Sequence, residues 1–306
     1  MIRWISFAGA LLLCAALTAC GADKAAPSGW TLTYKDQSVA VSSQPRRVAV
    51  LTTPLLNMSC AAGGLPIARP TTGNPIPAEA EALPELGQAQ HINMETLLSL
   101  SPDFVLGEVS QNRKLEPLLT GSGIPCLLVN YDGIDDNVPL MRLLGRLYGT
   151  EPQAEAAIAS YEEKLRAAEA EGASHAPARI AVLRATGKDV TAETASAICA
   201  SMAAKLHMRN VVTEGKSLPS SAKTVPYSLE QLAADDPDII FIVTMGRQQE
   251  IAAVLDQTLR GNPAWSGLSA VRTGRVYFLP QELFLLNPGM RTPEAMEQLL
   301  RLAYPA

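Results

Sequence analysis

The sequence predicts an α/β fold with two halves joined by one long helix, and three observations support this prediction. Short apolar runs alternate with helical stretches from Arg46 to the C-terminus. Residues 150–172 form one helical segment that is far longer than the others. A motif in the first half also recurs with the same internal spacing in the second half. Continuous apolar strands that alternate with helices are typical of a parallel sheet covered on both faces.

The first half, residues 46–149, contains three predicted strands and three predicted helices. The strands are short, uncharged apolar runs at residues 48–51, 104–106 and 126–129. The helices each end at or near a glycine, which favours the left-handed turn after a helix, and they cover residues 55–62, 112–119 and 138–147.

Residues 150–172 are predicted to form a single connecting helix. Thr150 suits the N-cap, Pro152 suits the first turn and Gly172 suits the end. The residues between them are rich in alanine, glutamate and lysine, which have high helix propensity. About twenty residues at 1.5 Å each make a rod roughly 30 Å long. We therefore expect this helix to connect two lobes and to have one packed face.

The second half, residues 178–306, repeats the alternation of the first. Its predicted strands are again apolar runs, at residues 179–183, 211–212, 239–243 and 276–279. Its predicted helices cover residues 195–206, 248–259 and 293–302. The two halves thus predict two α/β lobes of similar construction.

Residues 1–19 resemble a bacterial secretion signal. A single arginine is followed by an uncharged apolar run up to Leu17, shorter than the roughly 20 residues that span a bilayer. The run ends in Leu17-Thr18-Ala19-Cys20, which resembles the site where bacterial lipoproteins are cleaved and lipidated. A buried apolar helix or an ordinary cleavage site are the alternatives. We expect Cys20 to be the lipidated first residue of an exported, membrane-tethered protein, with residues 20–45 as tether and lead-in.

The charge balance argues against nucleic acid as a partner, and the cysteines indicate neither a disulfide framework nor a metal site. The chain has 25 basic and 30 acidic residues, a net charge of −5, which argues against nucleic acid as a partner. Cys60, Cys126 and Cys199 lie among apolar neighbours without CxxC spacing. We expect them to be buried apolar residues rather than a disulfide framework or a metal site.

The repeated motif places one glutamate in each half. Glu95 lies two residues before a leucine and seven before Pro102-Asp103, and Glu230 has the same spacing to Pro237-Asp238. In both copies the Pro-Asp pair opens an apolar strand, and an asparagine or serine two positions before the glutamate can cap a helix. The shared spacing predicts equivalent helices in two similar lobes, each presenting one carboxylate.

Together, these motifs resemble those of a known protein family. It is similar to the periplasmic binding proteins that serve iron–siderophore, haem and cobalamin ABC importers. The resemblance runs from about Arg46 to the C-terminus and is carried by PRRVAVL, LGQAQHINMETLLSLSPDFVLG, MRLLGRLYGTEPQAEAAIASYEEKL, SLEQLAADDPDIIFI and NPAWSGLSAVRTGRVYFLP.

The resemblance implies an architecture and a set of partners. It implies two Rossmann-like three-layer lobes joined by a single long helix, with a ligand cleft between them. Each lobe of this family carries an exposed glutamate that engages arginines of the transporter, and motif position assigns this role to Glu95 and Glu230. The implied partners are ABC permease subunits, an ATPase acting through them, and a metal-chelate ligand, and we expect the protein to be a monomer.

Ligands of open α/β sheets bind beyond the carboxyl ends of the strands, which predicts where the ligand site lies. The loops at those ends offer hydroxyl groups in the first half and arginines beside apolar groups in the second. Cationic and apolar groups together suit a large anionic or amphipathic chelate, although each arginine could equally be a solvated surface charge. The candidate ligand-binding residues are Thr52, Thr53, Tyr131, Arg184, Met245, Arg247, Phe284 and Arg291.

Other functions receive little support from the sequence. His91, His175 and His207 are the only histidines, and none lies in a strand-end loop, so we expect no metal site. No GxSxG, HExxH, P-loop or GxGxxG motif is present, so we expect no catalytic residues and no cofactor. An exported hydrolase or chelatase, a direct metal-ion binder and a surface adhesin are the alternatives. Siderophore, haem and cobamide ligands all fit the loops named.

Overall fold

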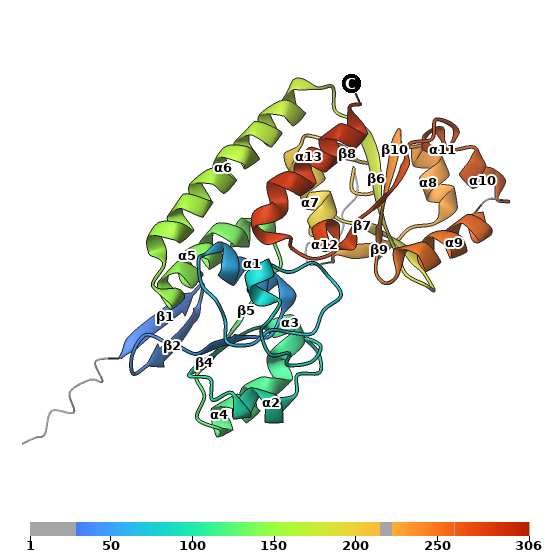
Figure 1. Cartoon of the computed structure of the whole chain (residues 1–306). Coiled ribbons are helices and arrows are strands. Elements are labelled where there is room, and N and C mark those ends of the chain that lie inside the picture. Colours follow the sequence, from blue (N-terminus) through green and yellow to red (C-terminus); the bar gives the residue numbers. More distant parts are fainter. Residues whose placement is uncertain (1–28, 215–221, 260, 306) are drawn as a thin grey trace, which may run out of the picture.

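The computed structural model describes residues 29–214, 222–259 and 261–305. These residues form two α/β lobes, and the long helix α6 (Glu151–Ser174) runs along one side of both (Figure 1). The predicted secretion signal and Cys20 lie outside the described residues, so the lipidation of Cys20 stays a prediction. No described helix combines the length and the hydropathy that crossing a membrane requires.

The first lobe contains a three-stranded parallel sheet in the order β3-β4-β5. Its strands are β3 (Val48–Val50), β4 (Phe104–Glu108) and β5 (Cys126–Val129). Its helices are α1 (Thr53–Ala61), α2 (Met94–Ser99), α3 (Val109–Asn112), α4 (Glu116–Gly121) and α5 (Asn137–Tyr148), with short 3-10 turns at 78–80, 113–115 and 134–136. The predicted helix at 112–119 is wrong as one unit, because the chain forms α3, a 3-10 turn and α4 there.

Alternate residues of each strand pack on opposite faces of this sheet. Val48 and Val50 belong to the core that α1 and α5 cover, whereas Ala49 belongs to the core that includes Leu97 of α2 and Leu119 of α4. Because both faces are buried, the strands are continuously apolar, as the sequence predicted. The lobe therefore has three layers.

Residues 30–41 differ from the predicted tether and lead-in, since they form an antiparallel hairpin. Its strands β1 (Trp30–Tyr34) and β2 (Gln37–Val41) pair along their full length. Leu32, Tyr34 and Val41 are buried in the core of the first lobe. The period-two alternation of apolar residues in β1 is the signal that predicts such a half-buried strand.

The second lobe contains a mixed sheet, in the order β11-β10-β6-β7-β9, with β8 also paired to β6. The strands are β6 (Arg179–Ala185), β7 (Val190–Glu193), β8 (Arg209–Asn210), β9 (Thr224–Pro226), β10 (Ile239–Thr244) and β11 (Val276–Leu279). The prediction of a parallel sheet is wrong for β7 and β9, which pair antiparallel. The predicted strand at 211–212 is also wrong, because Val211 and Val212 are buried in a turn that follows β8.

Helices cover both faces of this second sheet as well. They are α7 (Ile198–Lys205), α8 (Leu229–Asp235), α9 (Gln248–Leu259), α10 (Pro263–Ser266), α11 (Ser269–Arg272), α12 (Gln281–Phe284) and α13 (Thr292–Ala303). Ile180 and Val182 of β6 pack in one core with α7 and α13. Ala181 and Leu183 of the same strand pack in the other, which includes Leu232 of α8.

Helix α6 packs closely against both lobes because small residues lie at its contacts. A Cβ atom at Gly145 of α5 would lie 2.6 Å from the Cβ of Ala154, and one at Gly172 would lie 2.7 Å from the carbonyl oxygen of Leu206. One helix therefore contacts each lobe, as the sequence predicted. Thr150 is at the N-cap, but its hydroxyl donates to the carbonyl of Ala62 (2.6 Å) instead of capping α6.

Candidate functional site

The space between the lobes contains two adjoining pockets, which together form the candidate ligand cleft. The first has a volume of about 120 Å³ and is lined by both lobes. The second, of about 310 Å³, is lined mainly by the first lobe. Residues common to both pockets are Thr53, Pro54, Asn74 and Leu286. The cleft lies beyond the carboxyl ends of β3 and β4, where ligands of open α/β sheets bind.

The first lobe contributes neutral hydrogen-bonding groups to the cleft. Besides the start of α1, the loops at 71–74 and 88–90 and the side chain of Gln111 line it. Neither of these loops was predicted from the sequence. They belong to the stretch between α1 and α2, which contains only one short 3-10 turn. Long connections with little secondary structure are often functional, and this was the available signal.

Six of the eight predicted ligand residues fall into three groups in the structure. Thr52, Thr53 and Arg291 line the cleft. Met245, which follows β10, is 53% exposed but lines neither of the two pockets. Tyr131 and Phe284 are buried, and Phe284 belongs to the core of the second lobe. These two side chains therefore do not line the cleft.

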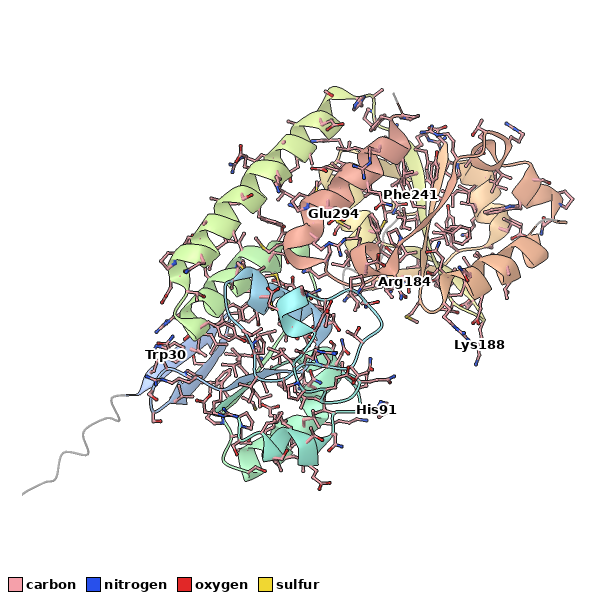
Figure 2. The ribbon with its side chains drawn as sticks, in the orientation of Figure 1. Trp30, His91, Arg184, Lys188, Phe241 and Glu294 are labelled. Carbon is pink, nitrogen blue, oxygen red and sulfur yellow. The ribbon has the colours of Figure 1, made fainter. Side chains whose placement is uncertain are left out.

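Each of the three predicted arginines forms an ion pair with a neighbouring glutamate. Arg184 Nη2 lies 2.6 Å from Oε1 of the buried Glu193, and its side chain is only 16% exposed. Arg247 pairs with Glu250 at 2.8 Å, and Arg291 donates two hydrogen bonds, at 2.8 and 2.7 Å, to Glu294. Figure 2 shows Arg184 on the side of the second lobe that faces the first. Arg184 belongs to β6 rather than to the predicted loop after it.

A buried carboxylate, Glu108, lies directly under the hydroxyl of Thr52. Thr52 Oγ1 donates to Glu108 Oε1 at 2.6 Å, and the Glu108 amide donates to Asn112 Oδ1 at 2.9 Å. Burial raises the pKa of Glu108 to about 6, and the charge of Asp132 adds to this shift. The predicted strand ends at residue 106, whereas β4 continues to Glu108.

We expect Glu108→Gln to stabilise the protein at neutral pH but not in acid. The raised pKa means that the folded state binds more protons than the unfolded state between pH 4.5 and about 6, so stability falls as pH rises through that window. At 1.36 kcal/mol per pKa unit, the full effect above that window is roughly 2 kcal/mol. Urea denaturation at about pH 4 and pH 7.5 measures it.

The companion variant Thr52→Val gives the opposite change. The hydrogen bond from Thr52 lowers the pKa of Glu108, so its loss raises that pKa further. The stability of Thr52→Val should therefore continue to fall to a higher pH than that of the wild type. A stability difference between Glu108→Gln and wild type that does not change with pH would contradict this assignment.

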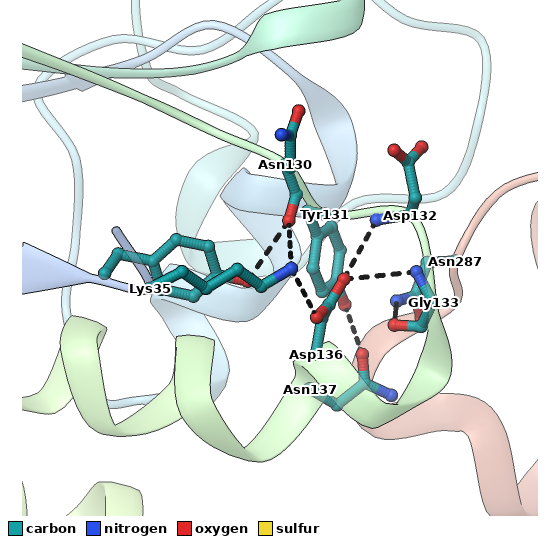
Figure 3. Close-up of polar contacts among 9 residues, drawn as sticks. Lys35, Asn130, Tyr131, Asp132, Gly133, Asp136, Asn137 and Asn287 are labelled. Carbon is teal, nitrogen blue, oxygen red and sulfur yellow. Dashed lines mark hydrogen bonds and ion pairs between the residues drawn. The ribbon is translucent and has the colours of Figure 1, made fainter. Parts of the chain in front are cut away.

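The segment 130–137, which leads into α5, links the two lobes (Figure 3). Asp132 forms an ion pair with Lys223 at 2.8 Å, and the carbonyl of Gly133 accepts a hydrogen bond from Asn287 Nδ2 at 2.7 Å. Both contacts join the first lobe to the second. At the end of the segment, Asn137 Oδ1 accepts a hydrogen bond from the hydroxyl of Tyr131 at 2.7 Å.

The repeated motif forms equivalent helix ends in the two lobes. Asn93 Oδ1 caps α2 by accepting from the Thr96 amide, and Ser228 caps α8 in a reciprocal capping box with Gln231. Both caps were predicted. Glu95 and Glu230 are exposed in the first turns of these helices, and the described residues show no ion pair for either. Hydrogen bonds from its own amide and from Ser228 lower the pKa of Glu230.

The Pro-Asp pair has the same structural role in each lobe. Asp103 accepts hydrogen bonds from the amides of Arg46 and Arg47, and Asp238 accepts one from the amide of Arg179. The guanidinium group of Arg47 in turn donates to the carbonyls of Leu100 and Ser101, just after α2, and that of Arg179 donates to those of Asp235 and Asp236, where α8 ends. The sequence did not predict these arginines, but they show that the repeat is a structural unit.

Two α/β lobes, one connecting helix and a cleft between the lobes define the class of two-lobed binding proteins. Residues 61–283 match the family described as periplasmic binding protein, and the chain belongs to that family. Within the described residues, no three His, Cys, Asp or Glu side chains are grouped so that they could hold a metal ion. Cys60, Cys126 and Cys199 have free thiols, and only Cys199 is fully buried.

Two relatives in sequence cover most of the chain. YhfQ of Bacillus subtilis, which is named as an ABC transporter substrate-binding lipoprotein, is 22% identical over 87% of this chain and 85% of its own length. The high-affinity heme uptake system protein IsdE of Staphylococcus aureus is 24% identical over 83% of this chain and 86% of its own length.

Solved structures show the same fold. IsdE complexed with heme matches with a TM-score of 0.72 and 19% identity over 86% of this chain and all of that chain. Staphylococcus aureus SirA complexed with staphyloferrin B matches with a TM-score of 0.71 and 18% identity over 89% of this chain and 98% of that chain. These matches confirm the predicted architecture of two lobes with a cleft between them.

Proposed function

We propose that this protein is the lipid-anchored substrate-binding component of an ABC importer that captures a metal chelate and delivers it to a permease. A ferric siderophore is the first candidate ligand, with haem and a cobamide next. The observation that carries the proposal is the cleft, which both lobes line and which lies beyond the carboxyl ends of β3 and β4. IsdE and SirA, which share the fold, are complexed with heme and with staphyloferrin B.

Within this proposal, the cleft residues divide by role. Thr53 and Arg291 are partly or fully exposed and line the cleft, so they contact the ligand. Thr52 holds Glu108 beneath the floor, while Tyr131 and Phe284 position the loops that carry the contacts. Arg184, Met245 and Arg247 lie at the ends of β6 and β10, outside the two pockets.

The proposed cell location follows from the first residues of the chain. Lipidation of Cys20 places the mature protein outside the cytoplasmic membrane, on its outer face or on the periplasmic side of an envelope. The name of YhfQ, a substrate-binding lipoprotein, supports this location. A tether raises the effective concentration of a binder near its permease, so a monomer can dock repeatedly without diffusing away.

We expect purified protein to bind one intact chelate, and native mass spectrometry with absorbance titration measures this. The mature chain is mixed in turn with a ferric siderophore, haem, a cobamide, and Fe³⁺, Mn²⁺ or Zn²⁺ alone. A single mass increase equal to that of an intact chelate is the expected result. Binding of a free metal ion in preference to every chelate would indicate direct metal capture. Turnover of a bound ligand would instead indicate the hydrolase or chelatase function.

A further inference from the structure

Two of the predicted ligand-binding arginines, Arg184 and Arg291, are each paired with a glutamate. The carboxylate of Glu193 is buried, and its only described ion pair is with Arg184. Turning Arg184 toward a ligand would leave that carboxylate unpaired in a place where water cannot compensate it. Arg291, which lines the cleft, is held by two hydrogen bonds to Glu294. Each of these two arginines is therefore already paired with a glutamate of its own lobe.

Two carboxylates near the cleft would also repel an anionic ligand. Glu282 lines the same pocket as Arg291. Glu108 lies under Thr52 at the floor, and Lys223, whose positive charge lowers the pKa of Glu108, is paired with Asp132. Among the residues that the structure describes, an anionic chelate entering the cleft would thus meet more carboxylates than unpaired cations.

The remaining lining groups are of two other kinds. Neutral hydroxyl and amide side chains predominate in the first lobe, and they can both donate and accept hydrogen bonds. In the second lobe, Leu285 and Leu286 line the cleft, and Leu286 is 46% exposed. An exposed leucine in a pocket offers apolar area that a ligand can cover.

We propose that the ligand is an electrically neutral chelate, with hydrogen-bonding groups that face the first lobe and an apolar face against Leu286, and that polyanionic chelates are rejected. This inference rests on the proposed function and narrows it, because a neutral trihydroxamate-type or corrinoid-type complex matches the charge of the lining groups while a polycarboxylate or catecholate complex does not. Selection against the anion comes from the carboxylates that it would approach without an unpaired cation.

Calorimetric titration with ferric chelates of different charge tests the proposal. The mature protein is titrated with a neutral ferric trihydroxamate, a trianionic ferric tris-catecholate and anionic ferric citrate, at about 20 mM and 300 mM NaCl. We expect the neutral complex to bind at least ~100-fold more tightly than either anion, with an affinity that salt changes by less than about twofold. Tighter binding of an anion, weakened by salt, would overturn the inference but leave the proposed function standing. If no metal chelate binds, cobamide and haem included, both fall.

Two variants with matched controls locate the selectivity. Glu282→Lys should strengthen binding of the tris-catecholate complex by ~10-fold or more, and Glu297→Lys, on the exposed face of α13, should not. Leu286→Asp should weaken binding of the neutral complex by ~10-fold or more, whereas Leu118→Asp, at a leucine that is 54% exposed on α4, should not. Both cleft side chains are at least partly exposed, so the fold tolerates the changes. Equal effects of cleft and control variants would count against the proposal.

Discussion

Reversing the charge of both Glu95 and Glu230 to lysine is expected to reduce uptake of the ligand by ~100-fold or more while ligand affinity changes less than about twofold. Both carboxylates are exposed, one in each lobe, in the first turn of a capped helix. The lowered pKa of Glu230 keeps it charged in moderately acidic surroundings. Neither glutamate lines the cleft, so ligand binding should not depend on them.

The size of the expected effect follows from where the two charges lie. A binder that docks through one carboxylate on each lobe loses both attractive contacts in the double variant and gains two repulsive ones. Each single variant should therefore reduce uptake by a smaller factor, and the two factors should multiply if the sites act independently. Charge reversal in a first turn replaces a favourable interaction of about 0.3–1 kcal/mol with an unfavourable one of similar size, and urea denaturation of each variant checks that it is folded.

Glu151→Lys is the matched control for this experiment. Glu151 is also an exposed glutamate in the first turn of a helix, but it belongs to α6 and not to the repeated motif. Uptake of a labelled chelate by cells that carry each variant, beside calorimetry on the purified proteins, separates docking from binding. Normal uptake by the double variant, or equal loss with Glu151→Lys, would show that the two glutamates do not form the docking contacts.

Local patterns were sufficient to predict the parts of the fold that short-range physics determines. The central strands of both lobes are apolar on both faces, so their composition alone marks them. Helix α6 has its proline, its small contact residues and its length within one continuous segment. The repeat around Glu95 and Glu230 could also be recognised, because the caps and the Pro-Asp pair lie within a few residues of each glutamate.

The errors arose where structure depends on partners that are distant or unpredicted. Arg184 was predicted to be available to a ligand because Glu193 becomes its neighbour only when β7 folds back antiparallel on β6. The short strand β7 has two of its four residues half-buried, and its sequence is not continuously apolar. The prediction of a large anionic or amphipathic chelate therefore relied in part on Arg184, whose charge is paired with Glu193 in the fold.

Asn137 shows the same dependence on distant partners, and its replacement should have the largest effect on stability. Its side chain is fully buried where both lobes meet α6. Its Nδ2 lies 3.0 Å from the hydroxyl of Tyr161, 2.9 Å from the carbonyl of Gly289 and 3.0 Å from Thr292 Oγ1. We expect Asn137→Leu to destabilise the protein by about 3 kcal/mol, since at least two buried polar groups lose their partner at roughly 1–3 kcal/mol each.

A double-mutant cycle with Tyr131 distinguishes this explanation from simple loss of packing. Tyr131→Phe leaves Asn137 Oδ1 without the hydroxyl that donates to it, at a cost of about 1–2 kcal/mol. In the Asn137→Leu background the same change removes a hydroxyl that is already unpaired, so it should cost nothing or restore some stability. Urea denaturation should therefore give a coupling free energy of at least ~1 kcal/mol. The exposed Asn130, changed to alanine, should alter stability by less than about 0.5 kcal/mol.

The same cycle bears on how the lobes move. Asn137 belongs to α5 of the first lobe, Tyr161 to α6, and Thr292 to the first turn of α13 in the second lobe, so a single amide joins all three. We expect such a junction, beside a helix that contacts both lobes, to restrict the lobes to small relative motions. Asn137→Leu should then weaken ligand binding although Asn137 does not line the cleft. If the unfolding free energies of Asn137→Leu and Tyr131→Phe are additive and ligand affinity is unchanged, the network contributes only packing and does not set the angle between the lobes.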